Sequence, residues 1–171
     1  MSIRKLYNQR EINSRVKELS KELYSVYKKE EVVFICTLKG AVFFACDLLK
    51  NYKGEARLEF LRVSSYKGKT STGKIELNLS ISKENIEGKN VVIIEDIVDT
   101  GRTIQRLKHM LSTREPKSVK VCTLLDKPSR RECDVKADYI GFEIDNVFVA
   151  GFGLDDDQHV RQLKYVGEVI F

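Results

Sequence analysis

The sequence predicts an α/β fold with a central, mostly parallel, twisted sheet flanked by helices. The first observation behind this prediction is a pair of apolar runs, residues 32–38 and 91–94, that lack polar alternation. Such runs are typical of strands buried on both faces of a parallel sheet. The second observation is that each run leads into a short turn with a glycine and then into apolar residues at helical spacing. Strand, tight turn and helix in succession indicate the start of a βαβ unit.

The first part of the chain supplies one helix and then a strand–helix pair. Residues 11–28 have an apolar stripe that predicts an amphipathic helix packed on the sheet. The stripe consists of Ile12, Val16, Leu19, Leu23 and Val26. The strand at 32–38 is followed by a helix, whose expected buried side comprises Val42, Phe43, Ala45, Leu48 and Leu49.

The remaining elements continue the alternation of strands and helices. Further strands are predicted at 57–66, 75–81 and 119–125, in addition to the run at 91–94. A helix is predicted through Ile104, Leu107 and Leu111, ending before Pro116. Residues 65–74 have almost no apolar side chain, which indicates a surface loop. Two short strand-like runs, 139–144 and 147–151, precede the tail.

Length, charge and cysteine content exclude several classes of protein. A chain of 171 residues fits a single domain that needs no disulfide or metal to be stable. Its 30 basic and 25 acidic residues give a net charge of +5, which alone does not indicate a nucleic-acid partner. The sequence has no signal peptide, no long apolar segment and no C-x-x-C pair, so we expect a cytoplasmic protein with no membrane partner.

The segment 91–104 combines a strand, two acids and a polar turn. Glu95 and Asp96 stand where the buried strand should emerge, and ligands of open α/β sheets bind at that edge. The turn at 99–103, Asp-Thr-Gly-Arg-Thr, opens a helix, whose first N–H groups and positive dipole end suit a phosphate. Carboxylates for sugar hydroxyls or a metal, placed beside a phosphate site, predict a phosphorylated sugar as the ligand.

This segment resembles the phosphoribosyl-pyrophosphate (PRPP) signature of the type I phosphoribosyltransferases: apolar residues, two acids, two apolar residues and Asp-Thr-Gly-x-Thr. The resemblance implies the fold of that family. It also implies that Glu95 and Asp96 hold the ribose hydroxyls and a Mg²⁺ ion. Asp99 would be the catalytic general base near purine N7, and the Arg102 side chain, at the variable position, would have no specific role. The implied PRPP ribose and phosphate site comprises Glu95, Asp96, Asp99, Thr100, Gly101, Arg102 and Thr103.

Beyond the signature, nearly the whole chain resembles the 6-oxopurine branch of this family, the hypoxanthine-guanine phosphoribosyltransferases. Leu38, Lys39 and Gly40 resemble its pyrophosphate loop, in which the Leu–Lys peptide can be cis. Arg161 matches a cation that faces pyrophosphate, and Asp155 matches a carboxylate for a second Mg²⁺. The resemblance therefore implies Mg²⁺ as the cofactor.

The resemblance also implies a purine site and a lid. Lys127 matches the lysine that donates to the purine 6-oxo group. Phe148 matches the aromatic residue that stacks on the base, and the backbone of Val149 would contact the purine edge. Ser65 and Tyr66 match the start of a mobile lid that excludes water during the reaction.

The implied protein is one phosphoribosyltransferase domain over residues 1–171, with about 140–171 contributing to a purine-binding hood. The implied reaction is purine salvage, in which the 5-phosphoribosyl group passes from PRPP to hypoxanthine or guanine, giving IMP or GMP and pyrophosphate. A homodimer or homotetramer and no nucleic-acid partner are expected. Two alternatives stay open: a xanthine-preferring enzyme, and a non-catalytic regulator that keeps the fold and binds RNA.

Overall fold

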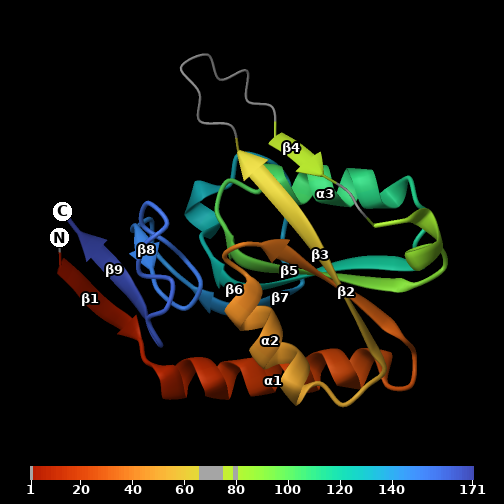
Figure 1. Ribbon diagram of the computed structural model, residues 1–171, viewed down its shortest axis with the longest axis horizontal. Helices are drawn as coiled ribbons and strands as arrows, with labels where there is room; N and C mark the ends of the chain where they lie inside the picture. Colours follow the sequence, from red (N-terminus) through yellow and green to blue (C-terminus); the bar gives the residue numbers. More distant parts are fainter. Residues whose placement is uncertain (1, 66–74, 79–80) are drawn as a thin grey trace.

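A six-stranded sheet forms the centre of the molecule in the computed structural model, which describes residues 2–65, 75–78 and 81–171 (Figure 1). The strand order is β4-β3-β2-β5-β6-β7. All neighbouring strands are parallel except β3 and β4, so the predicted mostly parallel α/β sheet is confirmed. The strands are β2 Val32–Leu38, β3 Ala56–Ser65, β4 Ile75–Asn78, β5 Asn90–Val98, β6 Ser118–Asp126 and β7 Tyr139–Glu143.

The parallel strands are wound in two directions from the middle of the sheet. β2 and β5 are neighbours, yet the chain passes from β2 to β3 on one side and from β5 to β6 on the other. Connections that diverge in this way open a crevice at the carboxyl ends of the two strands. Residues 32–36 and 91–94 are fully buried in these strands, as expected for a sheet covered on both faces.

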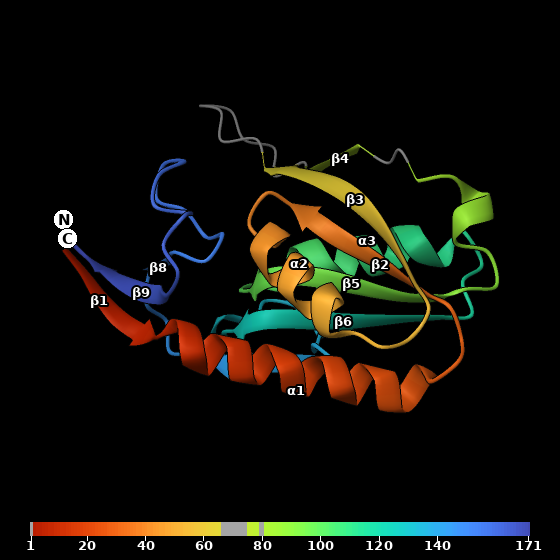
Figure 2. The same ribbon diagram turned by 60° about the horizontal axis from the view of Figure 1, so that its bottom comes forward.

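Helices cover both faces of the sheet (Figures 1 and 2). α1, Gln9–Tyr27, and α2, Val42–Asn51, pack on one face, and α3, Arg102–Ser112, packs on the other. α1 begins with a capping box, because the Asn8 side chain accepts from Glu11 N–H and the Glu11 carboxylate accepts from Asn8 N–H. Within the described part of the chain, no helix is long and apolar enough to cross a membrane.

Two apolar residues of these helices point outward, against the prediction. Val26 is 59% exposed, and the buried position after Leu23 is Tyr27, four residues further on. In α2, Phe43 is 43% exposed and Phe44 is buried instead. One step along a helix turns a side chain by about 100°, so a stripe drawn from sequence alone misplaces residues at its margin.

A second, antiparallel sheet stands beside the large one (Figure 2), and we call it the hood sheet. Its strands are β1 Ser2–Tyr7, β8 Val149–Ala150 and β9 Val166–Ile170, in the order β1-β9-β8. β1 was not predicted, since its residues carry no regular apolar pattern. β7 lies within the segment expected to contribute to the hood, but it pairs with β6 in the large sheet.

Candidate active site

The end of β5 brings two carboxylates to the crevice and then turns into α3. Glu95 and Asp96 lie near the end of the strand, after its buried apolar run. Gly101 is the N-cap of α3 and has a φ of 85°, a left-handed conformation that favours glycine. An added Cβ there would also lie 3.0 Å from Cys133 Sγ. The turn therefore directs the first N–H groups of α3 toward a position that suits a phosphate.

The loop after β2 forms the facing wall. The Leu38–Lys39 peptide is cis, as the resemblance implied. A Cβ on Gly40 would lie 1.6 Å from Asp96 Oδ2, and a Cβ on Gly153 would lie 2.1 Å from the Gly40 carbonyl oxygen. Two glycines thus allow three segments to meet: the loop after β2, the end of β5 and the loop between β8 and β9.

The loop between β8 and β9 carries charged groups to the same place. Arg161 Nη2 pairs with Asp155 Oδ1 at 2.8 Å, and Arg161 Nη1 donates to the Gly153 carbonyl at 2.7 Å. Gln158 Oε1 accepts from Lys39 Nζ at 3.0 Å, while Gln158 N–H donates to Asp155 at 2.8 Å. Gln158 therefore connects the predicted pyrophosphate loop to the loop that carries Arg161.

A cavity of about 430 Å³ lies between these walls. The predicted site residues that line it are Leu38, Lys39, Gly40, Glu95, Asp96, Thr103, Asp155 and Arg161. Thr37, Arg62 and Gln158 also line it and were not predicted. Arg62 reaches the cavity because β3 pairs in register with β2, which sets it beside Leu38. That register depends on tertiary pairing and has no local sequence signal, and Gln158 lies in no recognisable motif. Of the three missed residues, only Thr37 could have been suggested by its position, because it precedes Leu38.

The two adjacent acids, Glu95 and Asp96, have shifted pKa values. Burial, reinforced by the charge of Asp96, raises the pKa of Glu95 well above its ordinary value. Burial also raises the pKa of Asp96. Glu95 Oε2 is buried and has no hydrogen-bond partner among the residues that the structure describes. Buried carboxylate oxygens that lack a donor indicate a place for a cation. Among the residues described, no cluster of three or more His, Cys, Asp or Glu could hold a metal, so an ion here would need further oxygen ligands from water or substrate.

The predicted purine residues lie outside this cavity. Lys127, directly after β6, is 7% exposed, and its backbone N–H donates to the Val98 carbonyl at 3.0 Å. Burial lowers the pKa of the Lys127 ammonium, against the opposing effect of the nearby Asp99 charge. Phe148 is 46% exposed, and Val149 is buried in β8. These three residues come from two separate elements, and the cavity described above does not join them.

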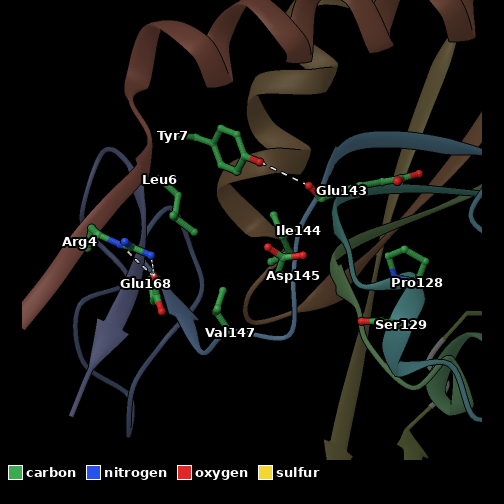
Figure 3. Close-up of a pocket in the computed structure, with 10 residues that line it drawn as sticks. All are labelled: Arg4, Leu6, Tyr7, Pro128, Ser129, Glu143, Ile144, Asp145, Val147 and Glu168. Atoms are coloured by element: carbon green, nitrogen blue, oxygen red, sulfur yellow. Dashed lines mark hydrogen bonds and ion pairs between the residues drawn. The ribbon is translucent and has the colours of Figure 1, made fainter.

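A second cavity, of about 330 Å³, separates the hood sheet from the end of β6 (Figure 3). Pro128 and Ser129 lie on one side of it, and Arg4, paired with Glu168, lies on the other. The predicted purine residues flank this gap without lining it, since Lys127 precedes Pro128 and Phe148 follows Val147. The lining residues are Arg4, Leu6, Tyr7, Pro128, Ser129, Glu143, Ile144, Asp145, Val147 and Glu168.

Two charged residues of the signature turn have partners of their own. Asp99 Oδ1 accepts from Arg130 Nε at 3.1 Å, and the Asp99 side chain is 42% exposed. The Arg102 side chain is 70% exposed and pairs with Glu132 at 2.5 Å. Its side chain is thus placed on the surface, while the Asp99 carboxylate stays accessible.

The predicted lid is described only at its edge. Ser65 is the last residue of β3 and pairs with Ile75 at the start of β4. Tyr66 lies outside the described residues. The lid therefore stays a prediction.

A doubly wound sheet, with paired acids and a glycine turn that opens a helix at its switch point, defines the class of α/β proteins that bind ligands at the carboxyl ends of their strands. Within that class, the chain belongs to the phosphoribosyl transferase family. The family model described as "Phosphoribosyl transferase domain" matches residues 2–157.

The relatives are named for the 6-oxopurine branch. The hypoxanthine-guanine phosphoribosyltransferase of Streptococcus thermophilus is 42% identical over 163 residues, which cover 95% of this chain and 90% of the relative. The hypoxanthine-guanine-xanthine phosphoribosyltransferase of Tritrichomonas foetus is 44% identical over 168 residues, covering 96% and 90%. The crystal structure of a hypoxanthine-guanine phosphoribosyltransferase from Bacillus anthracis has a TM-score of 0.92 at 39% identity, covering 99% and 100%. The resemblance to this branch is confirmed.

Proposed function

We propose that this protein transfers the 5-phosphoribosyl group from PRPP to hypoxanthine or guanine and releases pyrophosphate. The observation that carries the proposal is the cavity with Glu95 and Asp96 on one wall and Lys39 and Gly40 on the other. PRPP has a ribose diol beside a pyrophosphate group. It therefore needs acceptors for the hydroxyls on one wall of the cavity and cationic or N–H donors for the pyrophosphate on the other. The names of the relatives agree with this substrate class.

The proposed binding mode follows from charge. The ribose hydroxyls donate to Glu95 and Asp96, and the 5′-phosphate accepts from N–H groups and hydroxyls of residues 100–103. Lys39 and Arg161, both on the cavity wall, face the pyrophosphate. Anchoring the substrate at both ends holds the sugar carbon at which the bond breaks, and such positioning lowers the barrier to transfer.

The residues present also fit Mg²⁺. Glu95, Asp96 and Asp155 supply carboxylate oxygens on one cavity, and one Glu95 oxygen has no hydrogen-bond partner in the described part of the chain. Mg²⁺ prefers oxygen ligands and is commonly held by one or two carboxylates together with substrate phosphates. When bound, Mg²⁺ would neutralise negative charge on the leaving pyrophosphate.

The base would be recognised by the residues near the second cavity. Lys127 donates to the 6-oxo group, which disfavours adenine because its 6-amino group presents hydrogens. Phe148 stacks on the purine ring, and the Val149 backbone contacts its edge. Asp99 accepts the proton displaced as the base attacks the sugar through N9. The accessible Asp99 carboxylate supports this last role.

A second candidate substrate is xanthine. One relative, 44% identical to this chain, is named for hypoxanthine, guanine and xanthine together. Xanthine carries the same 6-oxo group, so Lys127 serves it equally well. The difference between these bases lies at the purine 2-position.

The proposal is tested by a spectrophotometric screen of hypoxanthine, guanine, xanthine and adenine, each with PRPP and Mg²⁺. Turnover of hypoxanthine and guanine, with adenine at background, is the expected result. Faster turnover of xanthine would select the second candidate. Preference for adenine, or no product from any base, would contradict the proposal.

We further propose that a second copy of the chain covers an exposed apolar surface next to α2, in a homodimer or homotetramer. Phe43 of α2 and Leu58 and Phe60 of β3 are exposed. Leu58 pairs in register with Phe34, which packs in the core on the α1 and α2 side, so the exposed β3 residues face that side. Light scattering should give twice or four times the chain mass, and Phe60→Lys should lower it. A wild-type monomer at assay concentration would contradict this.

A further inference from the structure

Arg131 follows the short turn after Lys127, and its guanidinium points back to the ends of β5 and β6. Nη1 donates to the backbone carbonyls of Asp99 at 2.5 Å and Val98 at 2.9 Å, and it lies 3.3 Å from the carbonyl of Lys127. Nη2 pairs with the Asp126 carboxylate. One side chain thus connects the turn that carries the proposed general base to the turn that carries the proposed 6-oxo donor.

These contacts are largely shielded from water. The side chains of Arg131 and Asp126 are 16% and 5% exposed. Arg131 Nε donates to the Val135 carbonyl at 3.0 Å, and Cδ would lie 3.2 Å from a Cβ added at Gly101. A guanidinium presents five N–H donors in a fixed planar fork, whereas a lysine ammonium is a point charge that cannot reproduce such a set of bonds.

The Lys127 backbone has two further bonds of 3.0 Å, one from its N–H to the Val98 carbonyl and one from the Arg130 N–H to its own carbonyl. A cavity of about 420 Å³, lined in part by Asp126, Pro128 and Arg131, lies beside the pair. If the guanidinium were lost, these two bonds would still hold Lys127 to β5 and to its own turn, but Arg131 is the side chain that contacts the carbonyls of both Lys127 and Asp99. The separation of the Lys127 and Asp99 backbones therefore depends in part on Arg131.

We propose that Arg131 is a positioning residue for base specificity, which fixes the Lys127 backbone relative to that of Asp99. Purine N7 and the 6-oxo group lie on the same edge of the ring. For a general base to contact N7 while a donor contacts the 6-oxo group, the distance between the base and the donor must therefore stay fixed. This inference rests on the proposed function, in which Asp99 faces N7 and Lys127 faces the 6-oxo group.

The test compares the affinities for IMP and for purine riboside 5′-monophosphate, which lacks the 6-oxo group, by isothermal titration calorimetry. The wild type should prefer IMP by about tenfold or more, because the analogue loses a hydrogen bond from a charged group. In Arg131→Lys this preference should fall by about threefold or more, because that bond is weakened. Partial unfolding lowers the active fraction for both nucleotides alike, so the affinity ratio responds to recognition of the 6-oxo group.

Arg15 provides a matched control. It also holds backbone carbonyls, donating to Ile140 at 2.7 Å and to Gly141 at 3.0 Å, but these partners lie in β7 and not in the turns that carry Asp99 and Lys127. Arg15→Lys should leave the affinity ratio unchanged. If Arg131→Lys does not fold, Asp126→Asn removes the charge that holds Nη2 and should lower the ratio in the same way.

The proposal is overturned if the ratio stays at the wild-type value in Arg131→Lys and in Asp126→Asn, or if the wild type shows no preference for IMP. A fall of the ratio in Arg15→Lys of the same size would also overturn it. Failure of the proposed function would be seen differently, as absence of phosphoribosyl transfer from PRPP by the wild type. The two failures are distinguishable because the affinity ratio requires no turnover.

Discussion

The candidate site has two halves that are assembled in different ways. The phosphate half consists of residues 38–40, 95–103, 155 and 161, and its walls approach so closely that Gly40 has no room for a Cβ. The purine half consists of Lys127, Phe148 and Val149, which come from β6 and the hood sheet and flank a gap of about 330 Å³. We call the first the packed half, because its walls touch at Gly40 and Asp96, and the second the open half, because its residues come from separate segments beside the gap.

This difference predicts different consequences of mutation. A change in the packed half displaces groups that hold the reacting sugar, so it should lower the rate of transfer with any base. A change in the open half leaves the sugar in place, so it should alter the choice of base more than the rate. The following predictions, from the largest effect to the smallest, test this contrast.

Asp99→Asn should have the largest effect. Asparagine keeps the size of the side chain and an oxygen that can accept from Arg130, but it cannot take up the proton of the attacking purine. General-base help is worth about 10²–10⁴-fold, so kcat should fall by that factor while the KM for PRPP changes little. Steady-state kinetics at saturating hypoxanthine measures both values. A normal kcat in this variant would exclude Asp99 as the base.

Gly40→Ala should rank second. The added methyl group would overlap Asp96 Oδ2, so the loop and the acid must move apart, and a misplacement of about 1 Å can cost about 10²-fold in rate. We expect this loss in kcat/KM for PRPP with hypoxanthine and guanine alike. A loss confined to one base would contradict the view that this half holds only the sugar and its phosphates.

Gly88→Ala is the matched control for that variant. Gly88 has a φ of 66°, and no atom of the described residues lies within 4 Å of an added Cβ. It lies before β5, at the end of the strand opposite to the crevice. The left-handed backbone should cost about 1–2 kcal/mol of stability, seen as a lower Tm, with kcat/KM unchanged.

The contrast also explains which parts of the site could be predicted from sequence. In the phosphate half, neighbours in the chain are neighbours in space: strand, acids, turn and helix all lie within residues 91–104. Arg62 and Gln158 reach the same cavity through strand register and through a distant loop. Neither lies in a local pattern, so the sequence alone gave no reason to choose them.

The fold shows the same limit. The doubly buried strands were located correctly, because burial on both faces leaves a continuous apolar run. β2 has the predicted bounds, whereas β5 continues past the predicted run at 91–94 to Val98. β1 was missed because a strand in a small, half-exposed sheet needs few apolar residues, and its partner β9 lies at the other end of the chain. Local sequence patterns thus predicted the strands of the core. They did not predict a strand whose partner lies far away in the sequence.

The pH dependence of kcat/KM for hypoxanthine should test the role of Lys127 in the purine half. Burial lowers the pKa of Lys127, so its ammonium loses the proton at a pH below the ordinary lysine value. As pH rises through that lowered pKa, the kcat/KM for hypoxanthine should fall by about tenfold, the difference between a charged and a neutral donor. Lys127→Arg keeps its charge at high pH and should lack this decline. Ionisation of hypoxanthine itself affects the wild type and Lys127→Arg alike. An equal fall of kcat/KM at high pH in the two proteins would therefore contradict the role of Lys127.

Arg102→Ala should have the smallest effect, although Arg102 lies in the centre of the signature turn. Its side chain is 70% exposed and pairs with Glu132 on the surface, and exposed ion pairs typically contribute about 0–1 kcal/mol. The contribution of this position to phosphate binding should come from its backbone N–H, which alanine keeps. We therefore expect kcat, the KM for PRPP and Tm of Arg102→Ala to stay close to the wild-type values. Arg102→Pro removes the backbone N–H but keeps a residue suited to the first turn of a helix. This variant should raise the KM for PRPP. A KM raised equally by both substitutions would mean that the guanidinium itself contacts the phosphate and that the packed half depends on more than its backbone.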